Sequence, residues 1–407
     1  VFSPDGERIA WLIMRRNGYE ADRNRLLSMD LRTGEWQDLS AEYGDDLDGP
    51  VWSPDGSTLW VTGPARGTVQ VFEASATGDG VRQVTEGVHD YTSLASATYG
   101  GETVLLATRR SMSAPVDIFR VDPSTGEAAA LTDENEALLA GMSLGKVEER
   151  IVTAKDGKEI LTWVIFPPDF DPSRRWPVLL YAKGGPQGPM SQSFSYRWNF
   201  QLMAANGYVV VAPNRRGTSG FGQEWEEEIS EDWGGGAMDD LLRAIDDVAA
   251  EPWADENRLG AIGASYGGYS VFWLAGNHEQ RFRTFVAHAG VFNLESMYGA
   301  TEELFFVNFD LGGPYWESPR PSSYDLHSPH KFVQNWDTPI LIIHGQQDFR
   351  VPVTEGMQAF TAAKLKGLDA RLLYYPEEGH WILSPQNGVL WHRIFFDWLG
   401  RTLKPSA

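Results

Sequence analysis

Residues 259–268 read Leu-Gly-Ala-Ile-Gly-Ala-Ser-Tyr-Gly-Gly, a Gly-x-Ser-x-Gly motif that follows an apolar strand pattern. A helix pattern begins around Tyr266. This strand–turn–helix setting is the one that a nucleophile elbow requires, because the sharp turn lifts the serine hydroxyl above the sheet. Gly263 and Gly267 leave room for that strained turn. We therefore predict that Ser265 is a nucleophile.

The chain around this motif alternates between strand and helix patterns. The clearest helix covers 237–249, with its apolar residues on one face, and an aromatic-rich helix closes the chain at about 388–403. Near-continuous apolar strands between helices predict a doubly wound, mostly parallel sheet covered on both faces, the α/β-hydrolase arrangement. The six predicted strands are 178–182, 208–212, 259–263, 285–288, 340–344 and 372–375.

A serine nucleophile needs a base, and the base needs an acid that orients it. In this fold the order along the chain is Ser, acid, His, each at the carboxyl end of a strand. Asp348 follows the strand at 340–344, and His380 follows the strand at 372–375. His380 is predicted to take the proton of Ser265, and Asp348 to fix the tautomer of His380.

The oxyanion of acyl transfer needs two hydrogen-bond donors. The backbone N–H of Tyr266 is one, and we nominate the N–H of Gly185, in the glycine-rich loop after the first predicted strand, as the other. Among the other histidines, we interpret His344 as a residue that shapes its loop and His288 as a packing residue. His327 and His330 have metal-like spacing, but without a carboxylate partner we do not predict a metal site.

The N-terminal part of the chain contains an internal repeat. Residues 1–6 read Val-Phe-Ser-Pro-Asp-Gly and residues 51–56 read Val-Trp-Ser-Pro-Asp-Gly, each a turn followed by an alternating strand. A degenerate third repeat begins near Tyr99. Four short strands per 40–50 residues are typical of a propeller blade, and propellers usually have at least four blades. We predict that 1–143 is the last part of a β-propeller and 144–407 the hydrolase domain; an unrelated β-sandwich is the alternative.

Composition limits the classes of function. The formal net charge is −22, which argues against nucleic acids and anionic membranes as partners, and the apolar runs are too short to span a bilayer. The absence of cysteine excludes disulfides and thiolate metal sites. No cofactor is predicted, because Ser, His and Asp need none. The chain begins in the middle of a repeat, so we expect it to be a fragment or a processed form.

Several segments together resemble the prolyl oligopeptidase family of serine peptidases, in which a propeller caps an α/β-hydrolase domain. The resemblance covers the chain from about residue 150 to its end. Further segments, at 196–206, 336–340 and 385–387, resemble the bacterial dipeptidyl peptidases of that family. The family segments are Gly184-Gly185-Pro186, Asn214-Arg215-Arg216-Gly217, Gly220-Phe221-Gly222, Asp232-Trp233-Gly234-Gly235, Gly263 to Gly268, His344-Gly345 with Asp348, and Gly379-His380.

The resemblance implies peptide substrates, from whose free N-termini dipeptides are removed, with a small or hydrophobic residue before the cut. It implies that Arg350 holds a substrate carbonyl, with a surface ion pair as the alternative. Lys183 departs from the family, since many relatives have His before Gly-Gly-Pro. Glu302 and Glu303 are candidate ligands for the substrate amine. The side chains implied to line the specificity pocket, for which core packing is the alternative, are Val291, Leu294, Met297 and Val351.

Three other functions compete with this hypothesis. An acylaminoacyl peptidase or general oligopeptidase would use the same scaffold, and only the amine-binding site separates these activities. A carboxylesterase would have no propeller. A propeller binding module with an inert hydrolase domain would have a broken triad. A homodimer is one candidate assembly, and the resemblance favours a periplasmic or secreted location over a cytoplasmic one.

Overall fold

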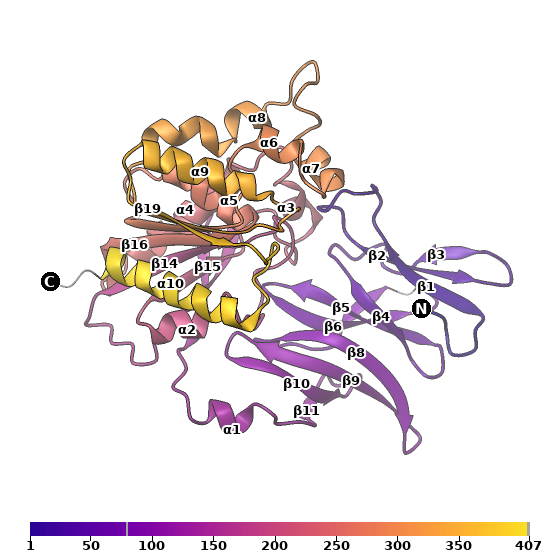
Figure 1. Ribbon diagram of the computed structural model, residues 1–407. Helices are drawn as coiled ribbons and strands as arrows, with labels where there is room; N and C mark the ends of the chain where they lie inside the picture. The colour runs from indigo at the N-terminus through magenta and orange to yellow at the C-terminus, as the bar shows by residue number, and fades with distance from the viewer. Residues whose placement is uncertain (79, 405–407) are drawn as a thin grey trace. The chain divides into compact units, whose positions relative to one another are not determined.

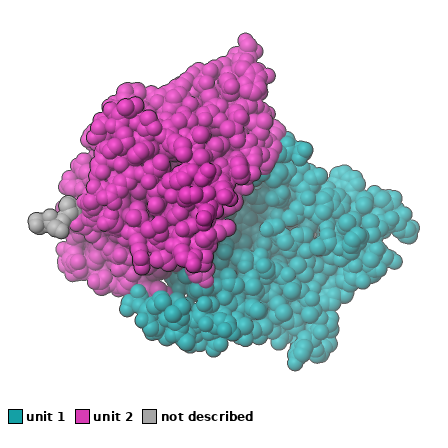
Figure 2. Space-filling model, viewed as in Figure 1, with its two compact units in different colours: residues 1–143, 188–195, 218–227 teal, residues 144–187, 196–217, 228–407 magenta. Residues whose placement is uncertain are grey.

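The computed structural model describes residues 1–78 and 80–404, which form two compact units (Figure 2). Unit 1 comprises 1–143, 188–195 and 218–227, and unit 2 comprises 144–187, 196–217 and 228–407. The sequence prediction places 188–195 and 218–227 in the hydrolase domain, whereas the structure groups both with the N-terminal part. Residues 405–407 of the predicted hydrolase domain lie outside the described residues.

Unit 1 contains a three-stranded sheet with an added bridge and then two groups of four strands, an arrangement like the predicted propeller blades (Figure 1). In the first, Phe2 bridges to β1, and β1, β2 and β3 form an antiparallel sheet. The second contains β4 to β7 and the third β8 to β11, joined through one parallel pair, Val69 with Asp90. The strands are β1 (Arg8–Ile13), β2 (Arg25–Asp30), β3 (Trp36–Asp38), β4 (Asp48–Trp52), β5 (Thr58–Ala65), β6 (Thr68–Ser75), β7 (Val81–Gln83), β8 (Asp90–Tyr99), β9 (Glu102–Ser111), β10 (Ala114–Val121) and β11 (Ala128–Ala130). Helix α1 (Glu136–Leu139) follows them.

The two Ser-Pro-Asp-Gly turns have the same hydrogen bonds. The hydroxyl of Ser3 donates to Asp5 Oδ1 at 2.5 Å, and that of Ser53 donates to Asp55 Oδ1 at 2.6 Å. Gly6 and Gly56 have φ values of 74° and 73°, which glycine adopts without steric cost. The repeat seen in the sequence is therefore a repeat of structure.

Two carboxylates, one buried and one half-buried, hold the two later segments in unit 1. Asp90, which is fully buried, accepts hydrogen bonds from the Ser191 hydroxyl at 2.7 Å and the Gln192 N–H at 3.1 Å. Asp45 accepts hydrogen bonds from the N–H of Gly220 at 2.8 Å and that of Gly222 at 3.2 Å. Both glycines belong to the segment 218–227, which also contains α3 (Gln223–Glu227). These side chains explain why 188–195 and 218–227 belong to unit 1, and nothing in their local sequence marks it.

Unit 2 contains an eight-stranded sheet in the order β12-β13-β15-β14-β16-β17-β18-β19. The first two strands are antiparallel to their neighbours, and the rest, from β15 on, pair in parallel. This confirms the predicted α/β-hydrolase fold. The strands are β12 (Val147–Thr153), β13 (Glu159–Ile165), β14 (Trp176–Ala182), β15 (Val209–Pro213), β16 (Ala254–Ala264), β17 (Thr284–His288), β18 (Ile340–Gly345) and β19 (Ala370–Tyr375).

Helices cover both faces of this sheet. In Figure 1, α5 and α9 lie on one face and α2 and α10 on the other. Helix α4 buries one apolar face, as its period predicts, and the aromatic residues of α10 that face the sheet, Trp391, Phe395 and Trp398, are fully buried. The helices of unit 2 are α2 (Phe200–Ala205), α4 (Gly236–Ala249), α5 (Tyr266–Asn277), α6 (Leu294–Tyr298), α7 (Leu304–Asp310), α8 (Ser323–Leu326), α9 (Val353–Leu365), α10 (Pro385–Leu403) and the 3-10 helix η1 (Pro329–Asn335). None of the helices in the described ranges is both long enough and apolar enough to cross a membrane.

Candidate active site

Ser265 lies at the junction of β16 and α5, with φ 60° and ψ −124°. A residue other than glycine rarely adopts this backbone conformation, which projects the serine hydroxyl out of the turn. The turn is closed by neighbours that leave no space for larger residues: a Cβ at Gly263 would lie 2.4 Å from the Gly267 carbonyl, and one at Gly267 would lie 2.0 Å from the Ala182 carbonyl. The local geometry is that of a nucleophile elbow.

Asp348 and His380 meet at the same edge of the sheet, in the loops after the adjacent parallel strands β18 and β19. His380 Nδ1 donates to Asp348 Oδ2 at 2.7 Å. The N–H groups of Arg350 and Val351 donate to the other carboxylate oxygen at 3.1 and 2.9 Å. Burial would raise the pKa of Asp348, but hydrogen bonds from His344 and His380 lower it to about 2. The acid is therefore ionised and holds His380 with Nε2 as the free base.

Two further histidines lie close to this pair. His344 Nε2 donates to the Val351 carbonyl at 2.8 Å and lies 3.5 Å from Asp348 Oδ2, so it supports the loop that carries the acid. His288 is fully buried and accepts from the Trp391 indole at 3.1 Å through Nδ1. Burial lowers the pKa of His288 well below its usual value, so it is neutral. Both side chains act as the sequence predicts, by shaping and packing.

The nominated oxyanion donors lie on either side of Ser265. Tyr266 is the first residue of α5, and the N–H groups of a first helical turn have no partner within the helix. Gly184 packs directly on the nucleophile, because a Cβ placed on it would lie 3.4 Å from Ser265 Cβ and 2.8 Å from the Ala264 carbonyl. The loop that contains Gly185 therefore borders the serine, which is the position that the second donor needs.

Of the residues implied for substrate binding, Arg350 forms an ion pair and the predicted pocket residues are buried in the core. Arg350 Nε lies 2.7 Å from Glu303 Oε1, the ion pair kept as the alternative, and its guanidinium lies 4.7 Å from the Trp381 ring centroid. Because Trp381 follows and contacts His380, the ion pair lies near that histidine. The predicted pocket residues are all at most 2 % exposed and belong to one core cluster: Val291, Leu294, Met297 and Val351. Their role in specificity stays a prediction.

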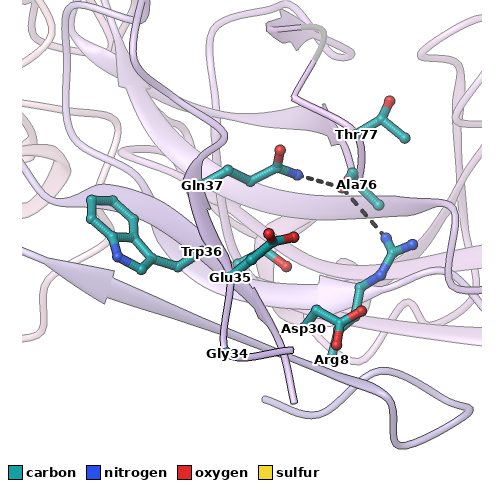
Figure 3. Close-up of a pocket in the computed structure, with 9 residues that line it drawn as sticks. Arg8, Asp30, Gly34, Glu35, Trp36, Gln37, Ala76 and Thr77 are labelled. Atoms are coloured by element: carbon teal, nitrogen blue, oxygen red, sulfur yellow. Dashed lines mark hydrogen bonds between the residues drawn. The ribbon is translucent and has the colours of Figure 1, made fainter. Parts of the chain in front are cut away.

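Two hollows lie elsewhere in the units. Figure 3 shows one of about 810 Å³ in unit 1, where the side chains of Arg8 and Gln37 both donate to the Ala76 carbonyl, at 3.4 and 2.9 Å. A cleft of about 540 Å³ in unit 2 contains the Arg281–Asp246 ion pair. None of the predicted site residues lines either hollow.

The expectation that His327 lacks a carboxylate partner is wrong. His327 does have a carboxylate partner, since its Nε2 lies 3.4 Å from Asp232 Oδ1, a residue 95 positions earlier that spacing alone does not connect to it. A single carboxylate and histidine do not form a metal site. Within residues 1–78 and 80–404, no group of three or more His, Cys, Asp or Glu side chains could hold a metal ion.

Comparison with known proteins identifies the family. The model of the prolyl oligopeptidase family matches residues 193–406, more than half of the chain. The chain belongs to the prolyl oligopeptidase family. This confirms the resemblance drawn from the motifs at Gly184, Ser265, Asp348 and His380.

Within the prolyl oligopeptidase family, the chain is similar along its whole length to curated dipeptidyl peptidases. It is 47% identical over 405 residues to dipeptidyl-peptidase 5 of Porphyromonas gingivalis, an alignment that covers 99% of this chain and 59% of that protein. It is 32% identical over 409 residues to dipeptidyl-peptidase 5 of Aspergillus fumigatus, covering 98% and 56%. The predicted likeness to bacterial dipeptidyl peptidases is confirmed. The chain spans about three fifths of the length of these relatives.

Two solved structures of peptidases show the same fold. An acylaminoacyl peptidase in complex with Z-Gly-Gly-Phe-chloromethyl ketone superposes with a TM-score of 0.88 at 23% identity, covering 99% of this chain and 63% of that one. Dipeptidyl peptidase 4 of Porphyromonas gingivalis superposes with a TM-score of 0.78 at 20% identity, covering 99% and 55%. At this identity the likeness establishes the fold and nothing finer.

Two residues that border the site, Lys183 and Arg215, have no role that the sequence predicts. Both donate to carbonyl groups of the Gly-Gly-Pro loop. The place of Arg215 in a matched motif and the place of Lys183 beside one are signals that they matter, but their partners are backbone atoms, which a sequence does not specify.

Proposed function

We propose that this chain carries the catalytic machinery of a serine exopeptidase that releases dipeptides from free peptide N-termini. The observation that carries the proposal is the pairing of a strained Ser265, at φ 60°, with an Asp348–His380 hydrogen bond of 2.7 Å at the same carboxyl edge of one parallel sheet. A packing serine would not need the strained turn, and a structural histidine would not need an ionised carboxylate on Nδ1.

The chemistry follows from these three side chains. The Ser265 hydroxyl gives its proton to His380 Nε2 while Oγ attacks the scissile carbonyl carbon, and the carbonyl electron pair moves to the oxygen. The tetrahedral intermediate collapses, the C–N bond breaks, and His380 returns the proton to the leaving amine. Water then attacks the acyl ester, giving one proton to His380. That proton returns to Ser265 Oγ as the carboxylic acid leaves.

Dipeptide release is the finer part of the proposal. It is supported by the names and the 45–47% identity of the bacterial dipeptidyl-peptidase 5 relatives, over 99% of this chain. A small or hydrophobic residue before the cut fits the aliphatic character of the side chains proposed to line the pocket, namely Val291, Leu294, Met297 and Val351. We propose that Arg350, beside Trp381, holds a substrate carbonyl.

The test uses matched chromogenic dipeptides, one series with a free amino terminus and one N-acylated, each with Ala, a larger apolar residue or Pro before the leaving group. We expect turnover of the free-amine series only, with Pro poor, and complete loss in Ser265→Ala, which should keep its fold. Equal or faster cleavage of the acylated series would overturn the exopeptidase proposal in favour of an acylaminoacyl peptidase or oligopeptidase. Activity that persists in Ser265→Ala would overturn the catalytic assignment.

A further inference from the structure

The carbonyl groups of the loop 183–187 point at two cationic side chains. The Lys183 ammonium donates to the carbonyls of Gly184 at 3.0 Å and Gln187 at 3.1 Å. The Arg215 guanidinium donates to the carbonyls of Pro186 at 2.8 Å and Lys183 at 3.3 Å. Every carbonyl of this loop except that of Gly185 therefore has a cationic donor.

The contact with the Gly184 carbonyl fixes the direction of the next N–H group. The peptide bond between Gly184 and Gly185 is trans, so its C=O and its N–H point in opposite directions. Because Lys183 holds the carbonyl oxygen, the Gly185 N–H faces away from the ammonium. A neighbouring cation also polarises the peptide group and makes its N–H a stronger donor.

This peptide group lies against the nucleophile. A Cβ on Gly184 would lie 3.4 Å from Ser265 Cβ, and a Cβ on Gly267, in the first turn of α5, would lie 3.3 Å from the Gly184 nitrogen. Gly185 itself is exposed, at φ 120°. The loop is thus next to the helix that supplies the other proposed donor, the N–H of Tyr266.

Arg215 links the two halves of this arrangement. Its fully buried guanidinium holds the loop carbonyls and lies 4.5 Å from the ring centroid of Tyr266. Asp310, also fully buried, accepts from the Gln187 side chain at 3.2 Å and from the Trp233 indole at 3.0 Å. These contacts anchor the base of the loop, and Lys183 alone among them holds the Gly184–Gly185 peptide.

We propose that Lys183 is a positioning residue for the oxyanion hole. By binding the Gly184 carbonyl, it orients and polarises the Gly184–Gly185 peptide so that the Gly185 N–H donates to the oxyanion formed at Ser265. This inference rests on the proposed serine hydrolase chemistry and names how its transition state is stabilised. It concerns the residue at which this chain departs from the His-Gly-Gly-Pro of many relatives.

The test compares Lys183→Met and Lys183→Arg in the full chain, with Lys155→Met as the matched control, because Lys155 pairs with Asp239 at 3.4 Å and touches neither the loop nor the nucleophile. In Lys183→Met we expect kcat to fall about tenfold to a hundredfold, with KM within about twofold. Affinity for a peptide boronic acid, whose tetrahedral adduct places an oxygen in the hole, should fall in parallel. Lys183→Arg should restore most of both, and Lys155→Met should change neither.

A purely structural role for Lys183 predicts a different result. Lys183→Met would then have a lower melting temperature and a higher KM. Its affinity for a substrate-like ligand, measured in a Ser265→Ala background, would fall as much as its affinity for the boronic acid. That pattern, or an unchanged kcat in Lys183→Met, would overturn the proposal. If Lys183→Met does not fold, Lys183→Gln, which keeps a neutral donor, should show the same split between kcat and KM.

A separate measurement keeps this inference distinct from the peptidase proposal. A fluorophosphonate reacts with the serine of any such site and places its phosphoryl oxygen in the same hole, whatever the natural substrate is. If the wild-type chain cleaves no peptide but reacts with the probe, the exopeptidase proposal fails alone. A rate of labelling that is equal in wild type and Lys183→Met would overturn the positioning role.

Discussion

The backbone of Ser265 is held in a conformation that costs about 1–3 kcal/mol for a residue with a side chain. Two backbone hydrogen bonds hold it there: the Ser265 N–H donates to the His288 carbonyl at 2.9 Å, and the Tyr269 N–H donates to the Ser265 carbonyl at 2.9 Å. The first ties the nucleophile to strand β17 and the second to helix α5. The position of the hydroxyl therefore depends on close packing between backbones.

Gly267→Ala tests that dependence. Its Cβ would lie 2.0 Å from the Ala182 carbonyl, a backbone atom that cannot move aside without shifting β14. We expect the free energy of unfolding, measured in urea, to fall by about 1–3 kcal/mol and kcat to fall by at least about tenfold. Gly388→Ala, in α10, is the matched control, since no atom lies within 4 Å of its Cβ and it should be neutral or stabilising. Equal effects of the two substitutions would contradict this account of the turn.

Asp348→Asn tests the role of the acid. An amide that replaces the carboxylate presents an N–H₂ to His380 Nδ1, which fixes the wrong tautomer, so we expect kcat to fall about ten-thousandfold with the fold retained.

The pKa of Asp348, about 2, also fixes the sign of a pH effect: the carboxylate is already ionised above that pH. Loss of kcat/KM on the acid side should therefore follow a single proton and owe nothing to the titration of Asp348. A slope of two protons between pH 4 and 9 would show that the acid titrates there as well.

At the scale of elements, the predicted strands agree with the structure because they consist of continuous apolar runs, which in the central strands β15, β17 and β18 are buried on both faces. The strand predicted at 340–344 is β18, Ile340–Gly345, and the one predicted at 208–212 is β15, Val209–Pro213. Once the sheet is parallel, the acid and the base must lie at one edge, so Asp348 and His380 could be paired from the sequence. Their hydrogen bond confirms that they meet.

The contacts of several side chains could not be predicted in the same way. The roles of Lys183 and Arg215 depend on which carbonyl groups face them, and no pattern in the side chains encodes this. The ion pair of Arg350 with Glu303 joins segments 47 residues apart, and spacing does not select one partner among many acids. Residues whose partners are backbone atoms or distant charges are therefore the ones that the structure adds.

At the scale of the whole molecule, the buried Asp90 helps to hold residues 188–195 in unit 1. Burial raises the pKa of Asp90 to about 6, despite hydrogen bonds from Ser191, Gln192 and Val69. Its pKa in the folded protein is thus above the value near 3.9 of an unfolded chain. The stability that this group contributes is fully present below about pH 4 and is lost as pH rises through about 6.

Asp90→Asn tests this linkage. The amide resembles the protonated acid, so it should not lose stability over that range. We expect the urea stability of the wild type relative to Asp90→Asn to fall by up to about 3 kcal/mol between pH 4.5 and 7.5. Asp5→Asn is a suitable control, because hydrogen bonds from Ser3 and Glu7 lower the pKa of that exposed acid. A difference between wild type and Asp90→Asn that is independent of pH would show that Asp90 is ionised throughout.

The grouping of 188–195 and 218–227 with unit 1 has a consequence for how this polypeptide is made. The hydrogen-bond donors of Asp90 lie about a hundred residues further along the chain, and those of Asp45 lie 175 and 177 residues further along. A ribosome therefore has to release about a third of the hydrolase sequence, as far as residue 227, before the blades are complete. For the same reason, exchanging the N-terminal module between relatives by a single cut near residue 143 would leave these two carboxylates facing foreign peptides, and a working chimaera would have to transplant both segments with it.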